Sequence, residues 1–215
     1  MNEKYKSYLS AISEFIPKDR IYTDDLRCLA WGTDAGFYRN IPQVVVRSCS
    51  EEEVSRLLAI ANKMCLPVTF RAAGTSLCGQ TNTDSILIVA GKNWEDYTVS
   101  PDATSITMQP GLVGKRVDDI LRPYGRVFTP DPASKNSAMV GGIVFNNASG
   151  MSCGTHANSD RELQSMRIVL ADGTVLDTGS EQSRADFART HAAFVKAIEQ
   201  LRDEVMADPD LVKRI

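Results

Sequence analysis

The first forty residues place their apolar side chains at helical spacing. From Lys4 to Ile16, apolar residues recur at positions that fall on one helical face and stop before Pro17, which predicts an N-terminal helix. A second, short helix is predicted over residues 24–30, with Thr23 or Asp24 as its N-cap.

Residues 44–70 predict a strand, a helix and a second strand. The β-branched run 44–46 is typical of a buried strand, and 66–70 predicts another short buried strand. Between them, Ser50 and Glu53 form a capping-box pattern before an amphipathic helix. The apolar face of that helix comprises Val54, Leu57, Leu58, Ala61 and Cys65. Because strand–helix–strand units build parallel pairs, we expect a βαβ unit here.

Beyond this unit, strand-like and helix-like patterns continue to about residue 180. The predicted elements are strands at 86–89 and 105–108, a helix at 113–121, and strands at 166–170 and 175–178. Asp172-Gly173, between the last two strands, is a strong hairpin signal. A charged helical stretch follows, from 181 to 215. The mixture indicates an α+β fold.

Charge and composition narrow the functional classes. The 215 residues carry 24 basic and 27 acidic side chains, a net charge of −3 that does not indicate nucleic-acid binding. No apolar run reaches the ~18 residues of a membrane span, and the N-terminus lacks a signal-peptide core. The five cysteines show no C-x-x-C pair and no zinc-site spacing, which predicts no metal site and a reducing compartment. We expect a soluble cytoplasmic protein, with peripheral membrane association of a longer protein left open.

The most informative segment is Arg71-Ala-Ala-Gly-Thr-Ser-Leu-Cys-Gly-Gln80, directly after the strand predicted at 66–70. A strand that opens into small residues leaves backbone N–H groups free, and such a nest with an arginine and hydroxyls at its rim suits a pyrophosphate. The alternative is an ordinary glycine turn.

A second segment of small residues lies about sixty positions further along. It comprises Thr129-Pro-Asp-Pro-Ala-Ser134 and then Ala138-Met-Val-Gly-Gly-Ile-Val-Phe-Asn-Asn-Ala-Ser-Gly150. The prolines extend the backbone, the paired glycines permit close approach, and the asparagines and serine offer hydrogen bonds. A helix N-terminus near 137–142 would further favour phosphates. Two such segments indicate one long ligand held at both ends.

Together the two segments resemble the FAD-binding domain of the vanillyl-alcohol oxidase/PCMH flavoprotein superfamily. The motifs R-x-x-G-T-x-L-x-G, P-D-P-A-S…G-G…N-A-S-G and L-A-D-G-T-V are similar to those of the FAD-linked oxidase family, in its D-lactate dehydrogenase and glycolate oxidase branch. The resemblance covers residues 41–179. It implies a PCMH-type fold with two lobes, a βαβ lobe at about 41–92 and a mainly antiparallel lobe at about 93–180, with residues 1–40 as an N-terminal helical segment.

The resemblance also assigns cofactor contacts, residue by residue. The first loop would cradle the FAD pyrophosphate through Arg71, Ala72, Ala73, Gly74, Thr75 and Ser76, closed by Gly79 and Gln80. The second segment would contact the adenosine, ribityl chain and flavin through Pro130, Asp131, Ser134, Ala138, Gly141, Gly142, Asn147, Ser149 and Gly150. Ile168 would cover the adenine, and Asn146 and Cys153 are further candidates.

Two departures from the family pattern matter. Covalent members carry a histidine in the first loop where this chain has Thr75, so we expect noncovalent FAD. His156, just past the second segment, could approach the cofactor but is interpreted as a polar loop residue, and His191 is expected to be a solvated residue of a polar helix. The family's V-G-[ST]-E-G-x-L-G-I segment and cap domain have no counterpart here, so the chain is expected to be the N-terminal part of a longer protein. Its catalytic residues are therefore unknown, because the substrate site lies mostly outside it.

The resemblance implies a flavin-dependent oxidoreductase that oxidises a D-2-hydroxy acid of the lactate, glycolate or 2-hydroxyglutarate class. One alternative is a superfamily member with different chemistry, such as a cell-wall precursor reductase or an ether-lipid synthase. Another is a noncatalytic nucleotide-binding module, although the chain contains neither G-x-x-x-x-G-K-[ST] nor G-x-G-x-x-G. The sequence leaves open the substrate, the electron acceptor, any iron–sulfur motifs and the oligomeric state.

Overall fold

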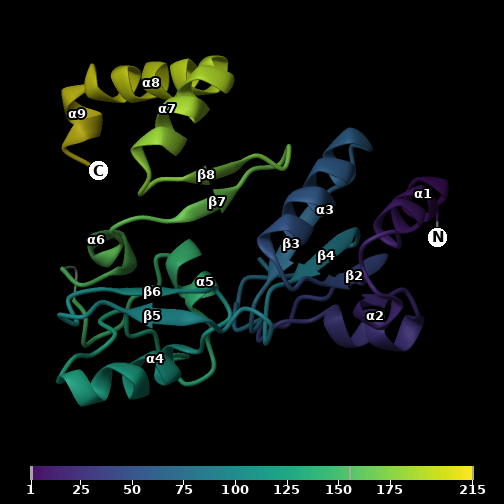
Figure 1. Ribbon diagram of the computed structural model, residues 1–215, viewed down its shortest axis with the longest axis horizontal. Coiled ribbons are helices and arrows are strands. Elements are labelled where there is room, and N and C mark those ends of the chain that lie inside the picture. Colours follow the sequence, from purple (N-terminus) through teal and green to yellow (C-terminus); the bar gives the residue numbers. More distant parts are fainter. Residues whose placement is uncertain (1, 155, 215) are drawn as a thin grey trace. The chain divides into compact units, whose positions relative to one another are not determined.

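A computed structural model of the chain describes residues 2–154 and 156–214 (Figure 1). The contacts divide it into two compact units. The first comprises Met1–Leu163 and Leu170–Thr174, and the second comprises Gln164–Val169 and Val175–Ile215. Each unit is described by itself.

The first unit begins with the predicted helical segment. Helix α1 spans Glu3–Ile12 and ends four residues before the predicted end, where the Ser13 hydroxyl donates to the Leu9 carbonyl. A 3-10 turn, η1 (Lys18–Arg20), leads into the short strand β1 (Ile21–Tyr22). Helix α2 (Asp25–Trp31) is capped by the Asp24 side chain, which confirms that prediction.

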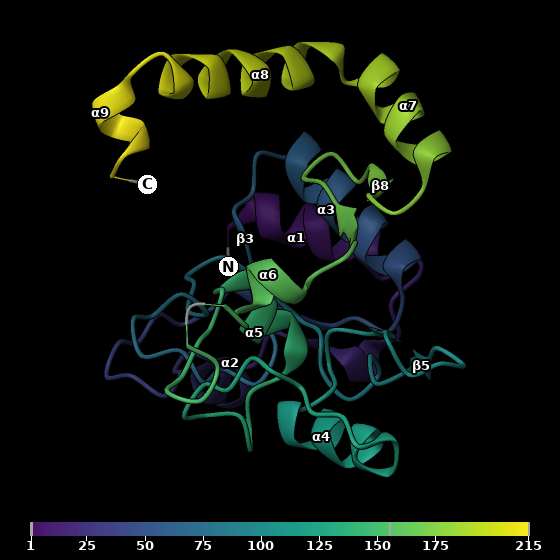
Figure 2. The ribbon, with the colours of Figure 1, turned by 90° about the vertical axis from the view of Figure 1, so that its left-hand side faces the viewer.

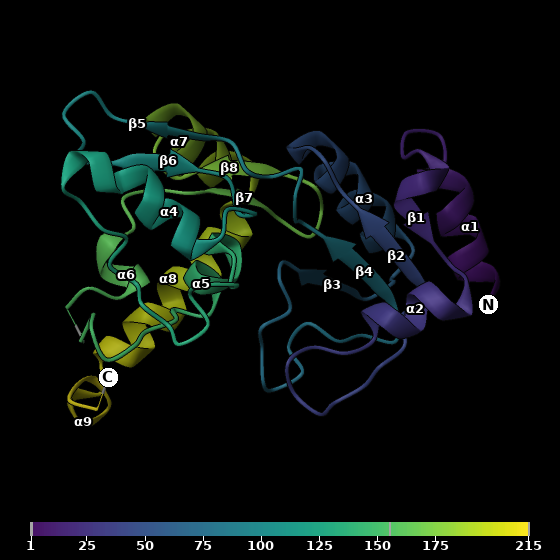
Figure 3. The ribbon, with the colours of Figure 1, turned by 90° about the horizontal axis from the view of Figure 1, so that it is seen from below.

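A four-stranded sheet forms the centre of the first unit. Strands β2 (Val44–Arg47), β3 (Val68–Arg71) and β4 (Ile86–Val89) lie in the order β1-β2-β4-β3, which Figure 3 shows from below. Both β2 and β3 run parallel to β4, whereas β1 is antiparallel to β2. The predicted βαβ crossover is therefore present, with β4 inserted between its two strands. The prediction that 66–70 is buried is wrong, because β3 is an edge strand and Phe70 is exposed.

Packing on the two faces of this sheet follows the alternation of its side chains. Val45, Leu87 and Val89 pack against Cys28 of α2, with Trp31 beside them. Helix α3 (Glu51–Lys63) buries Val54, Leu57, Leu58 and Ala61, as predicted. Cys65 was wrongly included in that face: it follows the helix with a left-handed φ of 53° and is exposed.

The start of α3 departs from a reciprocal capping box. The Ser50 hydroxyl accepts from the Glu53 N–H at 3.2 Å, as expected. The Glu53 carboxylate, however, accepts from the Cys49 N–H at 2.7 Å and forms two hydrogen bonds with Arg20, at 2.7 and 2.9 Å. This pair ties the N-terminal segment to the helix.

The described residues in the rest of the first unit form a hairpin and several short helices. Strands β5 (Tyr97–Val99) and β6 (Ile106–Met108) pair antiparallel. Helices α4 (Gly114–Leu121), α5 (Val140–Phe145) and α6 (Ser159–Glu162) follow, with the 3-10 turn η2 (Arg122–Tyr124) after α4. Leu112, Val117, Leu121 and Val140 form their core. The sequence missed β5, because Tyr97 and Thr98 are exposed and the strand shows no apolar face.

The second unit contains the predicted hairpin and the predicted helical stretch. Strands β7 (Arg167–Val169) and β8 (Val175–Asp177) pair antiparallel. Helices α7 (Glu181–Thr190), α8 (Ala192–Met206) and α9 (Pro209–Val212) follow in succession (Figure 2). The turn 170–174 belongs to the first unit, where the Ser55 hydroxyl donates to the Gly173 carbonyl at 2.5 Å.

The mixed helix-and-sheet class is confirmed, although the antiparallel strands form two separate hairpins rather than one sheet. The lobe boundaries at about residues 92 and 180 stay predictions. Among the residues that the structure describes, no helix has both the length and the apolar character to cross a bilayer.

Candidate functional site

The first loop presents a run of free backbone amides. Within the described chain, the N–H groups of residues 72–77 donate no hydrogen bond. Gly74 and Gly79 adopt left-handed φ angles of 72° and 75°, which curve the backbone around these amides. Consecutive free N–H groups in a curved loop are the geometry that an anion-binding nest requires, and the binding of a pyrophosphate here stays a prediction.

Arg71, at the start of the loop, points inward rather than standing at its rim. Its Nη1 donates to the Trp31 carbonyl at 3.3 Å and to the Thr33 carbonyl, and the guanidinium lies 5.3 Å from the Trp31 ring centroid. Burial lowers the pKa of Arg71, and the nearby Asp34 carboxylate partly offsets this. The expected rim arginine is therefore a support for the loop. A side chain at Gly74 would overlap the guanidinium, with a Cβ only 2.7 Å from Nε.

The segment around Asp34 holds the loop from the other side. The Ala35 N–H donates to the carbonyls of Gly74 and Ser76, at 3.0 and 3.1 Å. Asp34 Oδ1 accepts from the Gly36 N–H at 2.9 Å. These contacts turn the loop's carbonyls toward the protein and leave its amides free.

Unpartnered polar atoms gather at the same loop. In residues 2–154 and 156–214, the buried side-chain atoms without a hydrogen-bond partner are Asp34 Oδ2, Arg71 Nε, Thr81 Oγ1 and Asn82 Oδ1. A buried polar group left unpaired costs about 1–3 kcal/mol. Their concentration here fits a site that a polar ligand or bound water completes.

In the second segment, Lys135 organises the proline-containing part. Its ammonium lies 2.9 Å from Asp118 and 3.6 Å from Asp131 and donates to the Phe128 carbonyl at 2.6 Å. The side chain as a whole is 13% exposed. Sequence reasoning missed this residue, although its position four residues after Asp131 was a signal. Pro130 is buried, and the Ser134 carbonyl accepts from Ser137 and Ala138 N–H groups.

The glycines of this segment have different roles. A Cβ on Gly150 would overlap the Asp131 carbonyl, so this glycine lets the two parts of the segment approach each other. A Cβ on Gly141 would lie 2.6 Å from Pro110 Cβ, which assigns Gly141 to internal packing. Nothing lies within 4 Å of a Cβ on Gly142, so this position is open to a ligand.

The expected helix N-terminus contributes less than predicted. The first two amides of α5 are occupied, because Val140 N donates to Leu112 O at 2.7 Å and Gly141 N to Pro110 O at 2.9 Å. These amides are not available to phosphates. Ala138, just before the helix, is 4% exposed and lies in the core.

The polar residues at the end of the segment also differ in their contacts and exposure. Asn147 adopts a left-handed φ of 43°, and its Oδ1 accepts from the Asp160 N–H at 3.1 Å, which caps α6. Ser149 is exposed. Cys153 is buried, and its sulfur accepts from the Gly150 N–H at 3.1 Å.

One side-chain bridge joins the two segments. Gln80 Nε2 donates to Asn146 Oδ1 at 3.3 Å, and the Ser76 hydroxyl donates to Gln80 Oε1. This direct contact is consistent with the expectation that one long ligand is held by both segments, which stays a prediction. Phe37 and Phe145, 90% and 95% exposed, are apolar side chains on the neighbouring segments.

Three further residues were singled out from the sequence. Ile168 is in β7 of the second unit, where it pairs with Leu176, and its contact with adenine stays a prediction. His156 is exposed, as interpreted. His191 is half-buried and stacks on Phe187 at 4.4 Å, so it is not the solvated residue expected.

Curated relatives share most of this chain. It is 28% identical over 178 residues to the glycolate oxidase subunit GlcD of Escherichia coli, covering 81% of this chain and 36% of GlcD. It is 30% identical over 139 residues to D-lactate dehydrogenase of Archaeoglobus fulgidus, covering 64% of this chain and 31% of that dehydrogenase. It is 24% identical over 180 residues to D-2-hydroxyglutarate dehydrogenase of Haemophilus influenzae, covering 75% of this chain and 18% of that dehydrogenase. The chain thus spans about a third or less of these proteins.

Solved structures show the same fold at lower identity. Alkyldihydroxyacetonephosphate synthase matches with a TM-score of 0.72 at 19% identity, covering 84% of this chain and 38% of the synthase. p-Cresol methylhydroxylase matches with a TM-score of 0.69 at 15% identity, covering 84% and 38%. These likenesses concern the fold alone, and they confirm the PCMH-type architecture.

The family match covers strands β2, β3 and β4 and both loops, whereas β1 lies before it. Residues 42–179 match the family described as FAD binding domain, close to the 41–179 expected from the motifs. Because this match covers more than half of the 215 residues, the protein belongs to the FAD binding domain family, and the expected cofactor, FAD, is confirmed at the level of the family.

Proposed function

We propose that this chain binds FAD noncovalently, as the flavin-binding part of an oxidoreductase that oxidises a D-2-hydroxy acid. The observation that carries the proposal is the run of free amides at residues 72–77, joined to the second segment by the Gln80–Asn146 hydrogen bond. The relatives named for glycolate, D-lactate and D-2-hydroxyglutarate support the substrate class.

The site accepts FAD on physical grounds. Free amides suit the two phosphates of the cofactor. Gly142 leaves room for the cofactor to lie against α5. In the proposed complex, residues 72–76, Gln80 and the segment 130–150 hold the cofactor.

In this proposal the cofactor carries the redox chemistry, and the protein binds and orients the cofactor. Bound FAD supplies the acceptor for the hydride that leaves the hydroxy acid. This chain's own residues bind and orient it: Arg71 and Asp34 fix the first loop, and Lys135 fixes the second segment. We also propose a cytoplasmic location, for which the five free thiols are the supporting observation.

The test is flavin retention. The chain is incubated with FAD and passed through gel filtration to remove the excess. Its absorption is then measured at ~370 and ~450 nm, where oxidised flavin has its two bands. We expect these bands to co-elute with protein. Acid precipitation should then release all the flavin, since Thr75 stands where covalent relatives carry histidine. A folded chain that elutes colourless would contradict FAD binding by this chain, and flavin retained in the acid pellet would contradict noncovalent binding.

The substrate class is tested with the protein in its complete form. Anaerobic addition of D-lactate, glycolate or D-2-hydroxyglutarate should bleach the band near ~450 nm, whereas L-lactate and L-2-hydroxyglutarate should not. Bleaching by none of the three acids would contradict the proposed reaction while leaving FAD binding intact.

A further inference from the structure

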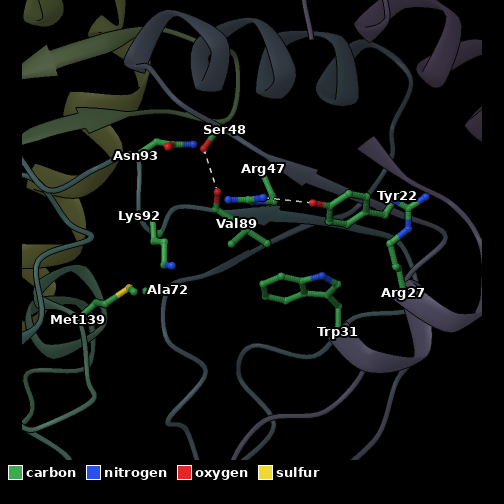
Figure 4. A pocket seen from close by; sticks show the side chains of 11 residues that line it. Tyr22, Arg27, Trp31, Arg47, Ser48, Ala72, Val89, Lys92, Asn93 and Met139 are labelled. Carbon is green, nitrogen blue, oxygen red and sulfur yellow. Dashed lines mark hydrogen bonds between the residues drawn. The ribbon is translucent and has the colours of Figure 1, made fainter. Parts of the chain in front are cut away.

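A hollow of about 400 Å³ lies at the carboxyl ends of two parallel strands (Figure 4). Arg47 ends β2 and is in register with Val89, which ends β4, and Lys92 follows three residues later. All three line the hollow. Ligands of open α/β sheets bind outside the carboxyl ends of the strands, and the volume is within the range of small-molecule sites.

The charges around this hollow are unbalanced. Its lining includes Arg27, Arg47 and Lys92 but no carboxylate. Arg27 is neutralised by Asp24, 2.5 Å away. Within the described chain, Arg47 forms one side-chain hydrogen bond, to the Tyr22 hydroxyl at 3.3 Å, and neither Arg47 nor Lys92 pairs with a carboxylate. Two unpaired positive charges therefore line one small space.

The arrangement favours a compact dianion. Figure 4 shows Arg47 on the strand side of the hollow with the Trp31 ring opposite it, and Lys92 farther along the lining, beyond Val89. A monocarboxylate would balance only one of the two cations, whereas a phosphate group carries a charge of about −1.5 to −2 near neutral pH. A guanidinium also binds phosphate oxygens in a bidentate manner.

We propose that this hollow is a phosphate-binding site in which Arg47 and Lys92 bind a phosphate or pyrophosphate group. The group has two candidate sources. Ala72, the first residue of the amide-rich loop, also lines the hollow, so the FAD pyrophosphate is one source. Arg71 is directed inward and leaves the charge of that pyrophosphate to other cations. A separate phosphorylated small molecule is the other source.

The test uses inorganic pyrophosphate and the FAD-free chain. Calorimetric titration at low ionic strength should show saturable binding that weakens about tenfold in Lys92→Met and in Arg47→Met, as expected for one lost charged contact each. Lys92 is exposed, so its replacement leaves the fold intact. Arg116→Met, at an exposed position of α4, removes the same charge elsewhere and should bind as the unmodified chain does. Absence of saturable binding, or equal affinity in all four proteins, overturns the proposal.

Repeating the titration with FAD-loaded protein separates the two sources. If FAD excludes pyrophosphate, and Lys92→Met weakens FAD but not riboflavin, the site belongs to the cofactor's pyrophosphate. If FAD-loaded protein still binds pyrophosphate, the site serves a separate phosphorylated molecule. The titration of the FAD-free chain does not depend on flavin, so failure of the proposed function and failure of this inference are distinguishable.

Discussion

Gln80 Nε2 lies 3.3 Å from Asn146 Oδ1, and this hydrogen bond joins two loops that are 66 residues apart in the chain. The Ser76 hydroxyl donates to Gln80 Oε1 and accepts from the Cys78 N–H at 3.3 Å, so the bridge is also connected to the backbone of the first loop. Because both amides are exposed, the bond contributes little to folding by itself. Its consequence is local: it links one side chain of the first segment to one side chain of the second.

The bridge is tested by a double-mutant cycle on FAD affinity. Gln80→Ala and Asn146→Ala should each weaken binding about three- to tenfold, since a hydrogen bond contributes about 0.5–1.5 kcal/mol. The double variant should be no weaker than either single one, because the same bond is lost once. Gln200→Ala, on exposed helix α8, is the matched control. Losses that simply add would show that the two amides act independently.

Gly74 should tolerate no larger side chain. In Gly74→Val, the left-handed φ of 72° is strained, and the new side chain overlaps the Arg71 guanidinium. We expect a loss of about 1–3 kcal/mol in unfolding free energy and no FAD retention after gel filtration. Adding Arg71→Ala should restore part of the stability by removing the overlap, but not the flavin. Near-native FAD affinity in Gly74→Val would contradict the assignment of this loop to FAD binding.

Gly142→Ala should separate folding from cofactor binding. The position lies in α5, has ordinary helical φ and has no atom within 4 Å of the new methyl, so the free chain should gain about 0.5–1 kcal/mol of stability. FAD retention should fall, because the methyl occupies space left for the cofactor. Gly125→Ala is the control: its surroundings are equally open, but its φ of 66° should make alanine destabilising. An FAD affinity that is unchanged in Gly142→Ala would place the cofactor away from α5.

Local patterns were enough to predict most of the elements, because their signals are short-range. The Asp24 cap, the Ser50 cap and the Asp172-Gly173 turn depend on neighbouring residues, and all are present. What failed depends on distant partners. The 66–70 strand looked buried from its own residues, yet its exposure is set by β4 taking the central position. Cys65 fell on the apolar face by periodicity alone, but the helix ends before it.

The same distinction applies to the site. The glycines and small residues of both segments identified the loops, because a nest is a local backbone feature. Their individual roles were not readable: Gly141 packs on Pro110, Asn147 caps α6 and Arg71 binds the carbonyls of Trp31 and Thr33. These contacts join segments far apart in sequence. Arg47 and Lys92 belong to no recognisable sequence motif, so nothing in the sequence singled them out.

The Arg20–Glu53 pair should make stability depend on acidity. Burial by itself would raise the pKa of Glu53, but hydrogen bonds from Arg20 and the Cys49 N–H lower it below the ordinary value of 4.5. A carboxyl with a depressed pKa in the folded state stabilises fully above its unfolded pKa, and that contribution is lost as pH falls through the folded value. Glu53→Gln should therefore cost about 1–3 kcal/mol at pH 7, and the difference from the unmodified chain should shrink below pH ~4.5. Urea unfolding at several pH values measures this difference in unfolding free energy.

The control is Glu52→Gln, at the exposed neighbouring position on the same helix turn, and its unfolding free energy should differ little from that of the unmodified chain at any pH. A difference that stays constant from pH 7 into the acid range would show that the Glu53 side chain acts through packing rather than through its charge.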